Sequence, residues 1–183
     1  MYHPRLKEKH YDMKDVFLVY DKSCFYEIVI LNYFMSYSHC DMVFCSLDGK
    51  PVRAMEGFSV NVEMPLEALD KAQVRSFILP GGNSSQIDTP EVKAYLQAFM
   101  KREILIAGIC AGVDVLDHVG ILCDVKSTHS SDADLVTDKN VITARANSYV
   151  DFAVEVAKKL NLFASEADLQ ETINFWKHDQ RVQ

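Results

Sequence analysis

The stretch Ile104-Leu105-Ile106-Ala107-Gly108-Ile109-Cys110-Ala111-Gly112 decides the fold, because it joins a buried strand to a helix through a tight turn. Residues 104–109 are apolar without interruption, as is typical of a parallel strand covered on both faces. A short helix is predicted from there to about His118, with Gly120 as its C-cap. The sequence therefore predicts that Cys110 sits on a sharp turn between a strand and a helix.

Strands and helices alternate along the rest of the chain. Apolar runs predict strands over residues 15–20, 41–46 and 74–79, β-like segments over 135–136 and 141–144, and helices over 25–35, 90–101, 148–160 and 165–178. This alternation predicts an α/β fold with an open, mostly parallel sheet that helices cover on both faces. In such sheets, functional sites lie at the carboxyl ends of the strands.

Two local signals predict how elements begin or turn. Asp48-Gly49 is typical of a hairpin, and it predicts that strand 41–46 pairs with residues 51–54. Ser148 and Asp151 have the spacing of a capping box, which predicts that the Ser148 side chain caps the following helix.

Length and charge narrow the function classes. The 183 residues predict a single domain over 1–183, with a polar leader at 1–14 and a C-terminal helical extension at 161–183. The formal net charge of −7 disfavours binding to nucleic acid and to anionic membrane surfaces. Neither a transmembrane span nor a secretory signal is visible, so we expect a cytoplasmic protein.

The cysteine pattern excludes two structural roles. There are five cysteines, an odd number, and none forms a C-x-x-C pair. This predicts neither a disulfide framework nor a zinc site. For most of the five, the expected role is that of a small buried hydrophobic residue.

Cys110 is different because Gly108-Ile109-Cys110-Ala111-Gly112 has the G-x-C-x-G spacing of a nucleophile elbow. A tight strand-to-helix turn needs small flanking residues and points the cysteine out of the sheet. The helix N-terminus then stabilises a thiolate and lowers the pKa of the thiol, and its N–H groups can hold an oxyanion. The alternative is a buried cysteine at a glycine-rich strand end, and the spacing alone does not exclude it.

Three further features accompany the elbow. Pro80-Gly81-Gly82-Asn83 ends the neighbouring strand, where the Gly82 N–H is a candidate second oxyanion donor or part of an ordinary turn. Glu27 is the only charged residue of an apolar helix, so it is either a buried protonated carboxyl or a solvent-facing side chain. His129 is a candidate base, which Asp132, Asp134 or Asp138 could orient, although a lone histidine is commonly a surface residue.

Three ordered segments resemble the PfpI and Parkinson-disease deglycase (DJ) superfamily, a group related to class I glutamine amidotransferases. They are Phe77–Asn83, Ile106–Gly112 and Asp138–Arg145, and the similarity runs from about Asp15 to Leu160. The resemblance implies a flavodoxin-like three-layer sandwich, a reactive cysteine and a homodimer. Attack of such a cysteine on an electrophilic carbonyl carbon, as in a glyoxalase, needs no metal and no organic cofactor, so we expect none.

The resemblance also implies roles for five residues. Cys110 matches the nucleophile, and Glu27 matches the glutamate that touches its sulfur. Gly82 and Ala111 match the residues whose amides form the oxyanion hole, and His129 matches the histidine of members whose base follows the elbow at a distance.

The chain departs from the family pattern at three places. Ala111 stands where the protease-like branch has histidine, so peptidase activity of that type is not expected. Val113 replaces a frequent proline, and Ala146-Asn147 replaces a frequent Gly-Pro-Gly. That loop often lies near the site or the dimer contact, which leaves the substrate and the partner geometry open.

Three hypotheses for function follow. The first is a cysteine-dependent enzyme of glyoxalase or deglycase type that acts on small electrophilic carbonyl compounds through Cys110. The second is a redox or stress sensor in which Cys110 is oxidised to sulfinic acid beside a protonated Glu27. The third is a binding or scaffolding domain that has kept the fold without the activity.

Overall fold

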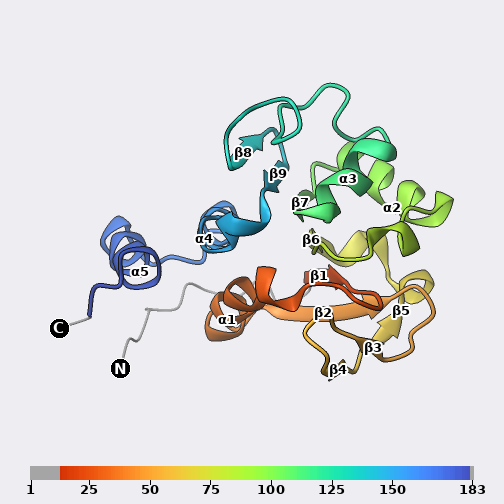
Figure 1. The fold of residues 1–183 in the computed structure, drawn as a ribbon, viewed down its shortest axis with the longest axis horizontal. Helices are drawn as coiled ribbons and strands as arrows, with labels where there is room; N and C mark the ends of the chain where they lie inside the picture. Colours follow the sequence, from red (N-terminus) through yellow and green to blue (C-terminus); the bar gives the residue numbers. More distant parts are fainter. Residues whose placement is uncertain (1–12, 182–183) are drawn as a thin grey trace.

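The computed structural model describes residues 13–181, so residues 1–12 of the predicted leader lie outside the described part. A seven-stranded sheet has the order β5-β2-β1-β6-β7-β9-β8 (Figure 1). All neighbouring strands in it are parallel except β8 and β9, which pair antiparallel. The predicted α/β fold with a mostly parallel, flavodoxin-like sheet is therefore confirmed.

The elements of this fold lie close to the predicted ranges. The strands are β1 Lys14–Leu18, β2 Asp41–Ser46, β3 Val52–Arg53, β4 Ser59–Val60, β5 Met64–Pro65, β6 Val74–Leu79, β7 Leu105–Ile109, β8 Leu135–Asp138 and β9 Val141–Ala144. The α-helices are α1 Val29–Tyr37, α2 Pro90–Lys101, α3 Ala111–His118, α4 Tyr149–Lys159 and α5 Glu166–His178. Short 3₁₀ turns are η1 Phe25–Glu27, η2 Leu66–Ala68, η3 Lys71–Gln73, η4 Ser84–Gln86 and η5 Ala146–Ser148.

Two apolar cores lie on the two faces of the sheet. Helices α2 and α3 pack on one face, and α1 and α4 pack on the other (Figure 1). Successive residues of β6 point to opposite faces, so Phe77 belongs to the first core and Ile78 to the second. Both side chains are fully buried, which explains why the central strands read as continuous apolar runs.

The predicted hairpin at Asp48-Gly49 is wrong. Strand β2 pairs in parallel with β5, and β3 pairs antiparallel with β4 around the turn at Glu56-Gly57. Asp48 instead makes a local turn, in which its Oδ1 accepts a hydrogen bond of 3.1 Å from the Lys50 N–H. The chain bends at Asp48-Gly49, but the Asp-Gly signal did not specify which strand the following segment pairs with.

The predicted capping box at Ser148 is also wrong. Ser148 makes no side-chain capping hydrogen bond, and its φ of −98° and ψ of 28° differ from the extended backbone that capping residues adopt. The chain enters α4 through the turn η5, which leaves the hydroxyl group badly placed to cap. By contrast, the Ser165 Oγ accepts from the Asp168 N–H at 3.2 Å and caps α5.

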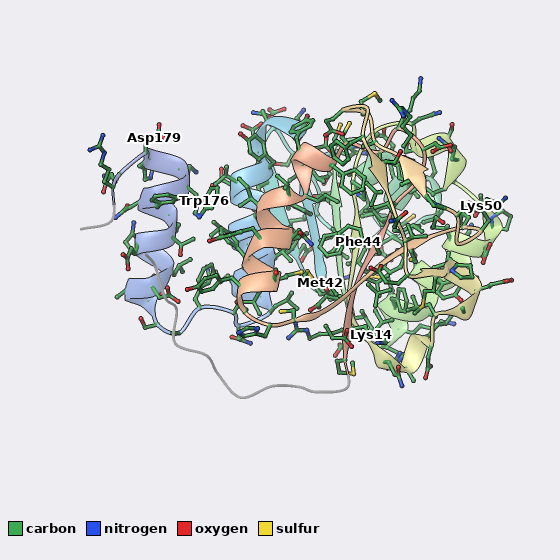
Figure 2. The ribbon with its side chains drawn as sticks, turned by 90° about the horizontal axis from the view of Figure 1, so that it is seen from below. Lys14, Met42, Phe44, Lys50, Trp176 and Asp179 are labelled. Atoms are coloured by element: carbon green, nitrogen blue, oxygen red, sulfur yellow. The ribbon has the colours of Figure 1, made fainter. Side chains whose placement is uncertain are left out.

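The C-terminal extension forms a helix, α5, that packs outside α1 and α4. The ring of Trp176, labelled in Figure 2, lies 5.6 Å from that of Tyr33 and 5.8 Å from that of Phe34. Lys177 forms an ion pair with Asp151 of α4 at 2.6 Å. None of the helices within residues 13–181 is long and apolar enough to span a membrane.

Candidate active site

Cys110 lies between the end of β7 and the start of α3, at the carboxyl edge of the sheet. Its φ of 54° and ψ of −128° fall in a region that residues with side chains rarely adopt. Such a conformation costs on the order of 1–3 kcal/mol and persists only where the surroundings enforce it. The Cys110 N–H donates to the Ala144 carbonyl at 2.9 Å, which ties the turn to β9.

Two glycines make this turn possible. A Cβ on Gly112 would lie 2.3 Å from the Leu79 carbonyl oxygen, and one on Gly108 would lie 2.8 Å from Leu116 Cδ1. The backbone contact at Gly112 leaves no room for a side chain, so α3 can approach β6 this closely only with glycine there. At Gly108 a Cβ would require the end of the Leu116 side chain to shift. The sequence motif thus has the steric basis expected of a nucleophile elbow.

Glu27 is buried beside this turn, which decides between the two interpretations of its sequence position. It is 1% exposed, and its Oε2 accepts a hydrogen bond of 2.7 Å from the Gly81 N–H. Its other oxygen, Oε1, is buried and has no hydrogen-bond partner within residues 13–181. An unpaired buried carboxylate oxygen is costly, so this environment favours the neutral acid.

Gly81 brings the carboxyl group and the thiol together. A Cβ at Gly81 would lie 2.8 Å from Glu27 Oε2, 2.9 Å from Cys110 Sγ and 2.7 Å from Cys110 Cβ. Both functional groups therefore pack against the bare α-carbon of this glycine. Any side chain there would push the thiol and the carboxyl group apart.

The ionisation of Glu27 and that of Cys110 are linked. Burial raises the pKa of Glu27, although hydrogen bonds from Gly81, Cys110 and Tyr26 lower it in part. Burial, and then the negative charge of an ionised Glu27, raise the pKa of Cys110 to about 11, while the Ala111 N–H lowers it. The predicted lowering of the Cys110 pKa is therefore wrong: the Ala111 N–H at the start of α3 favours the thiolate, but burial and Glu27 outweigh it.

A proton on Glu27 removes the second of these causes and leaves burial, the larger one, in place. The neutral carboxyl group no longer repels the thiolate and can donate a hydrogen bond to it. Two acidic groups this close lose their protons as a pair, so one shared proton determines whether Cys110 is nucleophilic.

Tyr20 fixes the glycine loop, a role that the sequence did not reveal. Its hydroxyl group lies 2.8 Å from both the Pro80 and the Gly81 carbonyl oxygens, to which it donates. Gly82 has a φ of +115°, and a Cβ there would lie 2.0 Å from the Lys22 carbonyl oxygen. The loop is therefore held against the chain that follows β1, which leads into Glu27.

Two amides are placed to bind an oxyanion. The Ala111 N–H faces the sulfur, because its hydrogen bond lowers the pKa of Cys110. The Gly82 N–H donates to no acceptor in the described part of the chain, so it is available to a ligand. The resemblance implied these two residues, and their joint role in an oxyanion hole stays a prediction.

The structure places His129 beside the site but not on the thiol. Its Nδ1 lies 3.0 Å from Asp117 Oδ2 and its Nε2 lies 3.2 Å from Asp114 Oδ1, both on α3. Neither ring nitrogen contacts Cys110 in the structure. A sequence signal for these partners existed in the spacing of the two aspartates, which puts them on one face of the helix that follows the elbow.

The three aspartates considered from the sequence do not orient His129. Asp138 instead accepts from the Lys126 N–H at 2.8 Å, and Asp134 pairs with Arg145 at 3.5 Å. All five cysteines are free thiols, but only Cys45 is buried, so the expectation that most of them are small buried residues is wrong. Within residues 13–181, no three His, Cys, Asp or Glu side chains gather in an arrangement that could hold a metal ion.

The fold and the elbow define a class of protein: flavodoxin-like α/β proteins that present a cysteine at the carboxyl edge of a parallel sheet. The chain belongs to the DJ-1/PfpI family, whose family model matches residues 13–159. The match contains β1, the glycine loop, the elbow and α4, so it covers each site residue described above.

Similar proteins support this assignment. An uncharacterized protease of Bacillus subtilis, YoaZ, is 30% identical over 136 residues, a match that spans 63% of this chain and 64% of that protein. A DJ-1 superfamily protein of Agrobacterium tumefaciens has a solved structure that is 28% identical, with a TM-score of 0.81 over 92% of this chain and 100% of that one. Oxidized DJ-1 of Toxoplasma gondii is 19% identical, with a TM-score of 0.77 over 89% of this chain and 97% of that one.

The raised pKa of Glu27 predicts a pH-dependent effect of Glu27→Gln on stability. A raised folded-state pKa means that the stabilising contribution of Glu27 is fully present below its unfolded pKa and is lost as pH rises through the folded one. The neutral glutamine keeps the form that the site prefers. We therefore expect the thermal stability of the variant, relative to that of wild type, to increase as the pH rises from 4 to 9.

Thermal unfolding at both pH values checks this expectation. Glu103→Gln is the matched control, because Glu103 is exposed and lies before β7, at the opposite edge of the sheet. An unchanged stability difference across this pH range, or a loss for Glu27→Gln at the higher pH, would contradict it.

Proposed function

We propose that this protein is a cysteine-dependent enzyme that acts on small electrophilic carbonyl compounds, with the chemistry of a cofactor-independent glyoxalase or deglycase. The observation that supports the proposal most is the convergence of Cys110 Sγ and the buried Glu27 carboxyl group at Gly81. A nucleophile and a proton-transfer group therefore meet at one point, next to two N–H groups that can donate hydrogen bonds to a negatively charged oxygen.

The proposed reaction with methylglyoxal begins when the Cys110 thiolate attacks the aldehyde carbon. The new carbon–sulfur bond places the former carbonyl electron pair on oxygen, which the amides of Ala111 and Gly82 stabilise. The neutral Glu27 gives its proton to this oxygen, and the carboxylate so formed moves the proton of the attacked carbon to the neighbouring carbon. The hydroxyl proton passes to the second oxygen, which gives a thioester of a hydroxy acid. Water cleaves the thioester, so the overall reaction is methylglyoxal plus water to lactate, with one proton released.

His129 has a different part in this proposal. Because its ring contacts Asp114 and Asp117 rather than the thiol, it exchanges protons with the bound substrate or with water. The name of the Bacillus subtilis relative suggests proteolysis, but Ala111 of this chain supplies no base next to the nucleophile. We therefore do not extend peptidase activity to it.

Replacing the nucleophile tests the enzymatic proposal. We expect purified protein to convert methylglyoxal to lactate without glutathione, and Cys110→Ser to lower the rate by at least a hundredfold, because a neutral hydroxyl group is a poor nucleophile here. Cys123→Ser is the control, since Cys123 is an exposed thiol outside the site and its loss should leave the rate unchanged. No lactate from wild type, or full activity in Cys110→Ser, would refute the proposal.

A redox sensor is the second candidate function, and the buried Glu27 favours it as well. Peroxide would transfer one oxygen to the Cys110 thiolate and leave as water, and a second peroxide would convert the sulfenic to a sulfinic group. A neutral Glu27 can donate a hydrogen bond to that sulfinate. The same contact that favours carbonyl chemistry would thus retain the oxidised sulfur.

Mass spectrometry after mild peroxide treatment separates the two functions. A sensor gains two oxygens selectively at Cys110, converts no aldehyde, and loses the selectivity in Glu27→Leu, which has no donor. An enzyme of the first kind converts the aldehyde whatever its oxidation behaviour. A thiol that stays reduced while Cys123 is oxidised would count against the sensor.

We also propose a homodimer in the cytoplasm, with a small molecule as the only other partner. The chain exposes apolar side chains on η1 and α1, where Val29 is 56% exposed, Tyr33 50% and Tyr26 44%. Such a contiguous surface is typical of protein contacts. Free thiols are typical of a reducing compartment.

Analytical ultracentrifugation tests the dimer. We expect the mass of two chains for wild type and of one chain for Val29→Asp, because burying an unpaired carboxylate in the contact is costly. Phe175→Asp, at an exposed position of α5, is the matched control and should leave the dimer intact. A monomeric wild type would contradict the proposal.

A further inference from the structure

A second thiol, that of Cys24, lies near Cys110 and has no part in the proposed carbonyl chemistry. Cys24 directly precedes the turn η1, which carries Glu27. Like Cys110, it is half-buried, so neither residue is closed off from solvent. Two thiols at one site can form a bond that a single thiol cannot, which makes the position of Cys24 relative to Cys110 important.

The chain before η1 pairs with the glycine loop as two short antiparallel segments. Ser23 and Gly82 form an antiparallel bridge. The pairing continues with a hydrogen bond of 2.9 Å from the Cys24 N–H to the Gly81 carbonyl oxygen. The backbone of Cys24 is extended, with a φ of −87° and a ψ of 103°. Cys24 therefore lies directly opposite Gly81.

This pairing directs the Cys24 side chain toward Cys110. Residues directly opposite each other in an antiparallel pair project their side chains to the same face, with Cβ atoms about 4.5–5.5 Å apart. A Cβ on Gly81 would lie 2.7 Å from Cys110 Cβ and 2.9 Å from Cys110 Sγ. Cys24 and Cys110 are thus both neighbours of the Gly81 side-chain position, and their Cβ atoms lie no more than about 8 Å apart.

The two side chains are close enough for a disulfide after a small movement. A disulfide places its two Cβ atoms about 3.5–4.5 Å apart, so the sulfurs can join if the chain before η1 or the elbow moves by at most a few ångströms. Glycine at position 81 permits this approach, because any side chain there would project into the space between the two cysteines.

The other three thiols are not placed in this way. Cys40 directly precedes β2 and therefore lies at the amino edge of the sheet, opposite to the edge that carries Cys110. Cys45 is fully buried within β2. Cys123 is exposed and lies in the chain that follows α3. Cys24 is thus the one cysteine that the fold brings to the elbow.

The surroundings of the two sulfurs give them different roles. The Ala111 N–H at the start of α3 favours the thiolate of Cys110. Burial, and then the negative charges of Glu27 and Glu56, raise the pKa of Cys24 to about 11 and keep it a thiol. Cys110 is therefore the sulfur that an oxidant meets as a nucleophile, and Cys24 is the neighbour that can react afterwards.

We propose that Cys24 is a resolving thiol, which converts a sulfenic acid on Cys110 into an intramolecular disulfide. Hydrogen peroxide transfers one oxygen to Cys110, which becomes a sulfenic acid, and the remainder of the peroxide leaves as water. The Cys24 sulfur then attacks the Cys110 sulfur. The S–S bond forms as the S–O bond breaks, and the hydroxyl group leaves with the thiol proton of Cys24 as water.

The inference deepens the redox candidate, on which it rests, and does not depend on the carbonyl chemistry. A sulfinic acid is not reduced by thiols, whereas a disulfide is. By reacting with the sulfenic acid before a second peroxide does, Cys24 makes the oxidation of Cys110 reversible. A dithiol reductant then restores both thiols.

Peptide mapping after oxidation tests the proposal without requiring turnover. The full chain is treated with one equivalent of hydrogen peroxide, the remaining thiols are blocked, and the protein is digested without reductant. We expect a pair of peptides joined through Cys24 and Cys110, two hydrogens lighter than the sum of the separate peptides. Dithiothreitol should then restore the alkylation of Cys110 by iodoacetamide.

Two variants assign the role to Cys24. Serine at this position cannot form the S–S bond, so in Cys24→Ser the sulfenic acid persists, and excess peroxide should raise the sulfinic fraction of Cys110 about fivefold over wild type. Cys40→Ser is the matched control and should behave as wild type. Cys40 is also half-buried, and burial raises its pKa to about 11 as well, but it lies at the opposite edge of the sheet.

The outcomes separate this inference from the proposals on which it builds. Sulfinic acid at Cys110 of wild type with Cys24 still reduced would overturn the resolving role and keep the sensor. A disulfide from Cys110 to any other cysteine would also overturn it. A Cys110 that stays reduced under peroxide would reject the sensor and the resolving role together. None of these results depends on aldehyde turnover, which tests the enzymatic proposal separately.

Discussion

The close approach of α3 to strands β6 and β7 is the constraint on which the site depends. It exists because Gly112 lies against the Leu79 carbonyl oxygen, where a Cβ would clash with backbone, and because Gly108 leaves room for the side chain of Leu116. The approach holds Cys110 in a conformation with positive φ, and the packing of the surrounding sheet offsets the unfavourable energy of that conformation. As a result, the thiol lies at the carboxyl edge of the sheet, next to the N-terminus of α3.

The chemistry of the thiol depends on a second close approach, at Gly81. This glycine donates its N–H to Glu27 and offers its bare α-carbon to both Glu27 and Cys110. Tyr20, two residues after the end of β1, holds the glycine loop in place, so the segments that follow the three neighbouring strands β1, β6 and β7 each contribute one part of the site. The carboxyl group and the thiol then share one proton, and its position decides whether the sulfur is inert or nucleophilic.

Much of this could be predicted from the sequence, for physical reasons. Strands buried on both faces are continuous apolar runs, and the elbow has a short-range steric signature, so β6, β7 and Cys110 were predicted correctly. The pairing of β3 could not be predicted from Asp48-Gly49, because a turn signal does not specify a distant partner. Nor could the burial of Glu27 or the contact of His129 with Asp114, since both depend on how separate elements pack.

The rate of alkylation of Cys110 by iodoacetamide as a function of pH tests the shared proton most directly. The account predicts a step below the value of about 11 that applies beside an ionised Glu27, because a proton retained on Glu27 removes the repulsion between the two groups. A single step near pH 11 would contradict it, because the thiol would then be inert at neutral pH.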